Sequence, residues 1–335
     1  MMHLFFVNNH MTYLTAKQTV KHLKLTSDKC LYLLERNYPI EKTSIQSLTF
    51  PYQNFPNDSF KASLAPWTLW KRMKELDTFL SEITNGEAFE IFYPQTAVTH
   101  FYIIASHPKC TGYSLIEGGI GCYKPEYKTR VSHGPSKLRK LFYSFIYKGR
   151  VPNQKFFFNT SLSNFKYSVG TNEYAFASYK NQLNVGSPFE EKEEYKDMKH
   201  VLVIDCVVEY YDAKMETIEE MMRLFFEKMK TENVKQIHFK LHPEHYRREG
   251  LRDKYVKLIR RMGGDIETIE LDNTVILEHI ARSSEAVFYV NISSVGLYAN
   301  ILGKEVWSFA RVLFKLEPHM DITYKEIGPN KIHYF

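Results

Sequence analysis

The chain has 335 residues, which is long for one hydrophobic core and sufficient for two domains. Its apolar fraction of 44% is ordinary and it contains 24 Phe and 23 Tyr, so the composition excludes an intrinsically disordered protein. The net charge of +6 favours an anionic partner, such as a nucleotide sugar, an anionic lipid surface or a nucleic acid.

The sequence also indicates a compartment. No run of about 18 apolar residues occurs, which excludes a membrane-spanning helix. The first residues lack the basic region, apolar stretch and small-residue cleavage site of a signal peptide. Cys30, Cys110, Cys122 and Cys206 are scattered with no close pair at metal-binding spacing, which favours reduced thiols over a disulfide scaffold. We therefore expect a cytoplasmic protein.

The first half of the chain alternates strand and helix patterns. In chain order, the predicted elements are strand 3–7, helix 12–22, strand 30–34, helix 67–83 and the buried strands 101–104 and 113–116. This order indicates a parallel sheet with crossover helices.

The middle of the chain changes in composition. Residues 151–190 are rich in Asn, Ser, Phe and Tyr and show no regular pattern. Gly186-Ser187-Pro188 then precedes the charged run 190–194. This shift predicts a domain boundary near residue 195, with an N-terminal domain over 1–195 and a C-terminal domain over 196–335.

The alternation restarts after this boundary. In chain order, the predicted elements are strand 200–205, helix 215–230, strand 236–240, helix 255–262, extended segment 265–271, helix 275–281, strand 286–290, helix 296–302 and strand 305–309. The predicted fold class is α/β, with two Rossmann-like doubly wound domains and a ligand cleft between them at the carboxyl ends of the strands.

A His-Pro pair follows the predicted strand 236–240. Pro243 favours an extended backbone at His242, and an imidazole there can donate a proton to a phosphate oxygen or place a positive charge beside it. The alternative is an ordinary surface histidine followed by a loop proline. The dipeptide alone is a weak signal, because His107-Pro108 also follows an apolar run in the first half.

Glu117 follows the predicted strand 113–116 and precedes Gly118 and Gly119. The glycines leave room for a substrate and permit unusual backbone angles, and a carboxylate at a strand end can take a proton from an acceptor hydroxyl. The alternative is a glycine-rich turn with a solvated glutamate.

Ser293 and Ser294 follow the predicted strand 286–290 and precede a helix. Hydroxyl groups and free backbone N–H groups at the start of a helix bind anions. The alternative is a plain capping serine. The competing pair Ser283-Ser284 ends a predicted helix, where this favourable field is absent.

Together these segments resemble the bacterial GT-B-fold sialyltransferases, the group of lipooligosaccharide sialyltransferases, polysialyltransferases and marine multifunctional enzymes. That family has an acidic D/E-D/E-G motif, an HP motif and an S/T motif in this order. The matching segments here are Glu117-Gly118, His242-Pro243 and Ser293-Ser294. Glu278 matches the family's glutamate that holds the CMP ribose, whereas Ile116 stands in place of the first acid of the acidic motif.

The resemblance implies a metal-independent, inverting transfer of sialic acid from CMP-sialic acid to a hydroxyl of a surface glycan precursor, such as O-antigen, capsule or lipooligosaccharide. It implies no cofactor besides this donor. The implied catalytic residues are Glu117, as general base, and His242, which protonates or stabilises the departing CMP phosphate. The implied donor-binding residues are Pro243, Glu278, Ser293 and Ser294. We assign Gly118, Gly119, Asn9 and His10 to the substrate pocket.

Other interpretations remain open. The donor can be another CMP-activated acidic sugar, such as Kdo or another nonulosonic acid. A non-catalytic nucleotide- or glycan-binding protein would not need Glu117. A nucleic-acid binder is disfavoured because the basic residues are dispersed and no binding motif occurs.

Residues 136–150 mix basic and apolar side chains in the pattern of an amphipathic helix. Such a helix can lie on an anionic membrane surface, where lipid-linked acceptors are found, and one interpretation is therefore peripheral contact with the inner membrane surface. The alternative is a helix with one core face and one solvated basic face.

Overall fold

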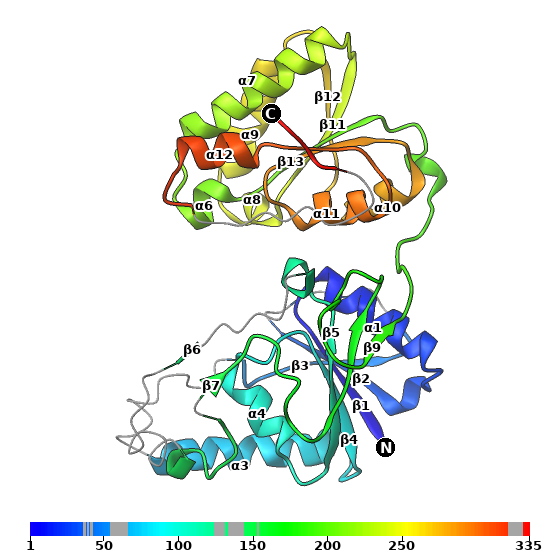
Figure 1. Ribbon diagram of the computed structural model, residues 1–335, viewed down its shortest axis with the longest axis vertical. Coiled ribbons are helices and arrows are strands. Elements are labelled where there is room, and N and C mark those ends of the chain that lie inside the picture. Colours follow the sequence, from blue (N-terminus) through cyan, green and yellow to red (C-terminus); the bar gives the residue numbers. More distant parts are fainter. Residues whose placement is uncertain are drawn as a thin grey trace. The chain divides into compact units, whose positions relative to one another are not determined.

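The computed structural model describes residues 1–35, 38, 40, 43–53, 66–123, 131–132, 144–152, 154–320 and 331–335. The chain forms two compact units, unit 1 (Met1–Pro188) and unit 2 (Phe189–Phe335), each built on its own parallel sheet (Figure 1). The α/β fold with two doubly wound domains that the sequence predicts is therefore confirmed.

Unit 1 contains a seven-stranded sheet in the order β3-β2-β1-β4-β5-β8-β9. Its strands, all parallel, are β1 (Met2–Val7), β2 (Cys30–Leu34), β3 (Gln46–Thr49), β4 (Phe89–Tyr93), β5 (Cys110–Ile116), β8 (Phe165–Gly170) and β9 (Gln182–Asn184). Its helices are α1 (His10–His22), α3 (Pro66–Ile83) and α4 (Thr99–Ala105), and β6 (Val131–Ser132) pairs with β7 (Gln154–Lys155) as a small antiparallel ribbon.

Helices cover both faces of this sheet because successive residues of its buried strands point to opposite sides. Leu4 and Phe6 of β1 lie in one core with residues of α3 and α4. Phe5, between them, contacts Tyr32 of β2, which packs edge-on against Tyr13 of α1.

Unit 2 contains a six-stranded parallel sheet in the order β12-β11-β10-β13-β14-β15. Its strands are β10 (His200–Ile204), β11 (Gln236–Leu241), β12 (Glu267–Glu270), β13 (Val287–Val290), β14 (Val306–Ser308) and β15 (His333–Tyr334). Its helices are α6 (Val207–Tyr211), α7 (Met215–Thr231), α8 (Pro243–Arg247), α9 (Leu251–Gly263), α10 (Leu277–Ser283), α11 (Ser294–Ile301) and α12 (Ala310–Leu316).

The strands of unit 2 show the same alternation. Val201 and Val203 of β10 lie in a core with α10 and α11. Leu202 and Ile204 lie in the opposite core with α7, α9 and α12. Both units are thus doubly wound, with helices on each face of the sheet.

The boundary between the units falls at residue 188, whereas the sequence predicts residue 195. The charged run 190–194 suggests a linker, but the residues on either side of it are buried. Phe189 packs edge-on against Tyr298, and Tyr195 belongs to a core of unit 2. The backbone N–H of Glu190 also donates to His279 Nδ1 at 2.8 Å.

One predicted element is wrong. Residues 101–104, predicted as a strand, belong to helix α4. Every residue of α4 is buried, so the segment shows none of the polar positions that reveal a helical period. The irregular middle also holds β8 and β9, which the sequence analysis did not predict.

Most of the predicted membrane-surface helix 136–150 lies outside the described residues, because the structure describes only 144–150 of it. That part packs on unit 1: Ile146 is buried and accepts a hydrogen bond from Trp70 Nε1 at 2.9 Å. Arg150 pairs with Asp77 at 2.6 Å. Among the residues that the structure describes, no helix combines the length and apolarity needed to cross a membrane.

Candidate functional site

Each sheet has a point where the strand order reverses. In unit 1 it lies between β1 and β4, and in unit 2 between β10 and β13. In open α/β sheets, ligands bind at the carboxyl ends of the strands beside such a point. The side chains that follow these strand ends are therefore the candidates for a ligand site.

Ser293 and Ser294 lie at the reversal point of unit 2. Ser293 caps α11, and its Oγ accepts a hydrogen bond from the backbone N–H of Val295 at 3.3 Å. Ser294 is the first residue of the helix, and both serines are half-buried. The predicted anion site therefore has the expected local structure, a capped helix start after a buried strand.

Asp205, which the sequence analysis missed, faces this helix start from the end of β10. Its carboxyl is hydrogen-bonded to the Ser293 hydroxyl and to the backbone N–H groups of Asn291 and Ile292. Burial raises the pKa of the Asp205 carboxyl to about 7, and these hydrogen bonds act in the opposite direction. Its Oδ2 is buried and finds no partner within the described part of the chain. The predicted phosphate site thus already contains an acidic group.

His242 follows β11 and caps α8. Its Nδ1 accepts a hydrogen bond from the backbone N–H of Glu244 at 3.2 Å, so the proton of the neutral ring is on Nε2. Its backbone N–H donates to Ile204 O at 3.0 Å and fixes it to the end of β10. Burial lowers the pKa of His242, which favours a neutral imidazole that donates from Nε2.

The remaining donor-side residues lie close to the carboxyl edge of the same sheet. Pro243 is the first residue of α8 and is exposed. Glu278 lies in the first turn of α10 and is buried, and burial raises its pKa. Lys240 of β11 exerts the opposite influence on that pKa, and its Nζ donates to Asn273 O at 3.1 Å. Unit 2 therefore carries all four predicted donor-binding residues and His242.

Glu117 lies at the end of β5 in unit 1 and is completely buried, which differs from both sequence interpretations of it. One carboxylate oxygen accepts hydrogen bonds from the Thr171 N–H at 2.7 Å and the Thr171 hydroxyl at 2.8 Å. The other accepts a hydrogen bond from the Tyr123 hydroxyl. Asn172 Nδ2 in turn donates to the Tyr123 oxygen at 2.7 Å. The carboxylate thus joins the ends of β5 and β8.

The two glycines after Glu117 play different parts. A Cβ on Gly118 would lie 3.1 Å from atoms of Pro94 and Thr12, so this glycine permits close packing on α1. Gly119 has a φ of +132° and open space where a Cβ would be, so it supplies the backbone turn.

Asn9 and His10 begin α1 at the end of β1. Asn9 caps the helix by accepting the Thr12 N–H at 2.9 Å, and its Nδ2 donates to Gly118 O at 2.9 Å. His10 Nδ1 is hydrogen-bonded to the Tyr38 hydroxyl at 3.0 Å. The structure therefore brings Asn9 and the Glu117 segment together.

A second buried acid was missed in unit 1. Glu35 directly follows β2, and its Oε1 accepts a hydrogen bond from the Tyr93 hydroxyl at 2.6 Å and lies 3.2 Å from His100 Nε2. Asn8 Nδ2 lies 3.5 Å from the other carboxylate oxygen. An acid immediately after the predicted strand 30–34 was the only sequence signal for this cluster.

His107 lies at the opposite edge of the sheet. It follows α4 and precedes β5, where its Nδ1 accepts a hydrogen bond from the Lys109 N–H at 3.1 Å. It is therefore at the amino end of a parallel strand, whereas His242 is at a carboxyl end.

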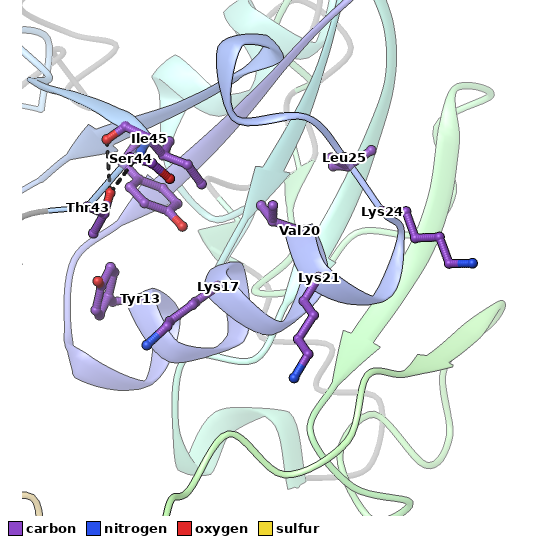
Figure 2. Close-up of a pocket in the computed structure, with 10 residues that line it drawn as sticks. Tyr13, Lys17, Val20, Lys21, Lys24, Leu25, Thr43, Ser44 and Ile45 are labelled. Carbon is purple, nitrogen blue, oxygen red and sulfur yellow. Dashed lines mark hydrogen bonds between the residues drawn. The ribbon is translucent and has the colours of Figure 1, made fainter.

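A separate pocket of about 340 Å³ lies on unit 1 beside α1 (Figure 2). Lys17 and Lys21 of α1 and Lys24, which follows that helix, line one side, and Thr43, Ser44 and Ile45, which precede β3, line the other. None of the predicted site residues lines it, and it extends toward the amino end of β3 rather than a carboxyl strand end.

No protein-family model matches the sequence, and no curated protein matches it. The UDP-GlcNAc 2-epimerase from Methanocaldococcus jannaschii is a similar solved structure, with a TM-score of 0.47, 13% identity and coverage of 92% of this chain and 84% of that chain. The spinosyn rhamnosyltransferase SpnG, solved with thymidine diphosphate, has a TM-score of 0.45, 12% identity and coverage of 92% and 80%. The wall teichoic acid polymerase TagF has a TM-score of 0.49, 12% identity and coverage of 99% and 76%. A likeness at this level identifies no reaction or ligand for this chain.

Proposed function

We propose that the protein is an inverting GT-B-type glycosyltransferase that moves sialic acid from CMP-sialic acid to a hydroxyl of a surface glycan precursor. The observation that carries this proposal is the arrangement of the carboxyl edge of unit 2. Ser293 and Ser294 begin a helix at the point of strand reversal, and His242 caps another helix nearby with its Nε2–H unused within the described residues. Hydroxyl, backbone and imidazole donors suit the single phosphate of a CMP-activated sugar.

His242 would act on the leaving group. As the acceptor oxygen attacks the anomeric carbon, the bond from that carbon to the phosphate oxygen breaks. A neutral imidazole that carries its proton on Nε2 can hydrogen-bond to that oxygen and stabilise its developing charge in the transition state, whereas transfer of a proton to it would require the imidazolium form. Because the donor has one phosphate, this step needs no divalent cation at the phosphate.

Glu117 would accept the proton of the acceptor hydroxyl, but only after one exchange of partners. Its buried carboxylate holds the Tyr123 hydroxyl on one oxygen. An acceptor hydroxyl that displaces Tyr123 would occupy the same position, while Thr171 keeps the carboxylate oriented through the other oxygen. The acceptor hydroxyl would therefore bind at the position that the Tyr123 hydroxyl occupies.

The burial of Glu117 also favours a second candidate function, a nucleotide- or glycan-binding protein without catalysis. In such a protein Glu117 would serve to join β5 and β8. The transferase and a nucleotide-binding protein both need the nucleotide site of unit 2, a glycan-binding protein does not, and only the transferase needs turnover.

Two measurements test these candidates. Thermal unfolding with CMP, UMP, GMP and AMP tests the nucleotide site, and we expect CMP alone to raise the Tm. Release of CMP from CMP-sialic acid and from CMP-Kdo, with glycan acceptors and without added magnesium or manganese, tests the reaction and the sugar. Stabilisation by CMP without release from either donor would support the binding protein. Equal shifts with all four nucleotides would contradict the transferase and a CMP-specific binding protein.

A further inference from the structure

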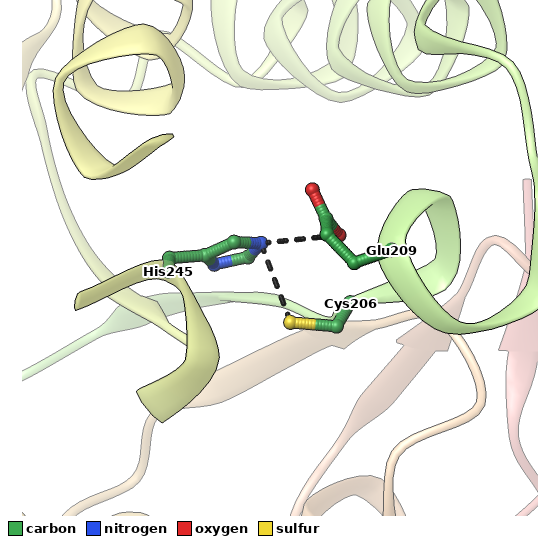
Figure 3. Close-up of side chains that lie close together, drawn as sticks. All are labelled: Cys206, Glu209 and His245. Carbon is green, nitrogen blue, oxygen red and sulfur yellow. Dashed lines mark hydrogen bonds and ion pairs between the residues drawn. The ribbon is translucent and has the colours of Figure 1, made fainter. Parts of the chain in front are cut away.

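A cluster of three side chains of types that can bind metals lies near His242 in unit 2, with Cys206 and His245 buried and Glu209 half-buried (Figure 3). Cys206 directly precedes α6, Glu209 lies in α6, and His245 lies in α8. Positions three residues apart on a helix face the same side, so Cys206 and Glu209 present their side chains together. His245 reaches them because β10 and β11, which precede the two helices, are neighbours in the sheet.

Two of the three separations between the ligand atoms match those of a zinc site. His245 Nε2 lies 3.5 Å from Cys206 Sγ and 3.5 Å from Glu209 Oε2, and all three atoms lie within 4.8 Å of one another. In a tetrahedral zinc site, bond lengths of about 2.0–2.3 Å place neighbouring ligand atoms about 3.3–3.6 Å apart. A nitrogen and an oxygen that share only a hydrogen bond lie closer, at about 2.7–3.2 Å.

The surroundings hold the ligands in position. The Tyr255 hydroxyl donates to Glu209 Oε1 at 3.0 Å, which leaves Oε2 to face the cluster. Glu209 Oε2 is buried and has no hydrogen-bond partner in the part of the chain that the structure describes. His245 is fully buried with its ring 4.2 Å from the ring of Tyr255, so packing fixes the ring although its Nδ1 has no partner within the same residues.

We propose that Cys206, Glu209 and His245 bind a zinc ion that clamps α6 to α8. A thiolate with an imidazole and a carboxylate is a donor set that suits zinc, and three protein ligands leave one position for water. The backbone N–H of His245 donates to His242 O at 2.9 Å, so a metal on His245 would also hold the turn that positions His242. The site lies wholly in unit 2, and its test is independent of any transferase activity.

The test uses the full-length protein with zinc alone. After incubation with zinc and removal of free metal, we expect one zinc ion per chain by elemental analysis and a higher Tm than for the chelator-treated protein. Cys206→Ser and Glu209→Gln should each lower the retained zinc at least tenfold. Cys30→Ser, a matched buried cysteine of unit 1 outside the cluster, should retain zinc as the wild type does.

Cobalt provides a second, spectroscopic readout of the same site. We expect the wild-type protein with cobalt to show thiolate-to-cobalt charge-transfer absorption, and Cys30→Ser to keep it. If Cys206→Ser fails to fold, zinc retention by Glu209→Gln and the cobalt spectrum of the wild type test the proposed site. Less than about a tenth of an equivalent of bound zinc, no thiolate band with cobalt, or full zinc retention in a folded Cys206→Ser protein would each overturn the assignment.

Discussion

Glu117 accepts hydrogen bonds on both carboxylate oxygens and has no exposed surface, so its role depends on whether one of these bonds can be exchanged. The strand end and the two glycines were visible in the sequence. The burial of Glu117 was not visible in the sequence. Tyr123 and Thr171, which cover it, belong to segments that approach each other only because β5 pairs with β8.

We expect Glu117→Gln to lower turnover by about two to four orders of magnitude while CMP binding stays near the wild-type value, because the loss of a general base acts on the acceptor step. Tyr123→Phe is the matched variant. It removes only the hydroxyl that the acceptor is proposed to displace, so it should keep at least a third of wild-type turnover. Rates of CMP release at saturating donor and acceptor, with the Tm of each variant, provide the measurement. A Glu117→Gln protein that keeps more than a third of turnover would place the base elsewhere.

Lys155 provides a pH-dependent prediction. It is buried, its Nζ donates to Thr99 Oγ1 at 2.5 Å, and burial lowers its pKa from 10.5 to about 8. Between these two pH values the unfolded chain binds more protons at this residue than the folded chain, so the contribution of Lys155 to the free energy of unfolding rises with pH. Lys155→Met should remove this rise.

Other groups titrate in the same range, so the measured quantity is the difference between Lys155→Met and the wild type. We expect the stability advantage of the variant to be largest below pH 8 and to shrink as the pH approaches 10.5. A constant difference in denaturant midpoint from pH 7 to pH 10 would contradict a buried neutral lysine.

At the scale of elements, the end of a parallel strand at which a side chain lies decides what it can bind. His242 follows β11, whereas His107 precedes β5. We expect His242→Ala to weaken CMP binding at least tenfold and His107→Ala to change it less than twofold, because only His242 lies at a carboxyl edge where ligands bind. Isothermal titration of CMP into both folded variants measures the contrast. Equal weakening in the two proteins would refute the assignment of His242 to the nucleotide.

Most elements with a clear pattern were predictable, including short buried strands such as β2 and β13, whereas the short, fully buried helix α4 was not. The helices α3 and α7 and the strands β1, β10 and β11 follow their sequence patterns closely. In α4 every side chain is buried, so only its tertiary packing distinguishes it from a strand.

The sequence likewise predicted the positions of some residues of the candidate site and not of others. The positions of His242 and Ser293 after strands were predictable, because a polar residue after an apolar run marks a strand end. The cluster of Cys206, Glu209 and His245 was not, because it depends on which strands are neighbours in the sheet. Asp205 was missed for a related reason, since its contact with Ser293 requires β10 and β13 to be adjacent.

At the scale of the whole molecule, the chain consists of two units with separate hydrophobic cores. A unit with its own core can fold alone. Every residue proposed to bind CMP belongs to unit 2, so this unit should carry the nucleotide site without the rest of the chain.

We expect the fragment 189–335 to unfold cooperatively and to bind CMP within about tenfold of the full chain, whereas a fragment of residues 1–188 should not bind it. The fragment 196–335, which begins at the boundary predicted from the sequence, is the control. It lacks Phe189 and Tyr195, which are 9% and 8% exposed in the folded chain. Burial of each aromatic side chain stabilises by about 1.5–3 kcal/mol as an upper value, so the shorter fragment should be less stable by several kcal/mol. Urea unfolding of the two fragments measures this difference. Equal midpoints would show that residues 189–195 are a linker after all, and a fragment 189–335 that folds but fails to bind CMP would remove the nucleotide site from unit 2.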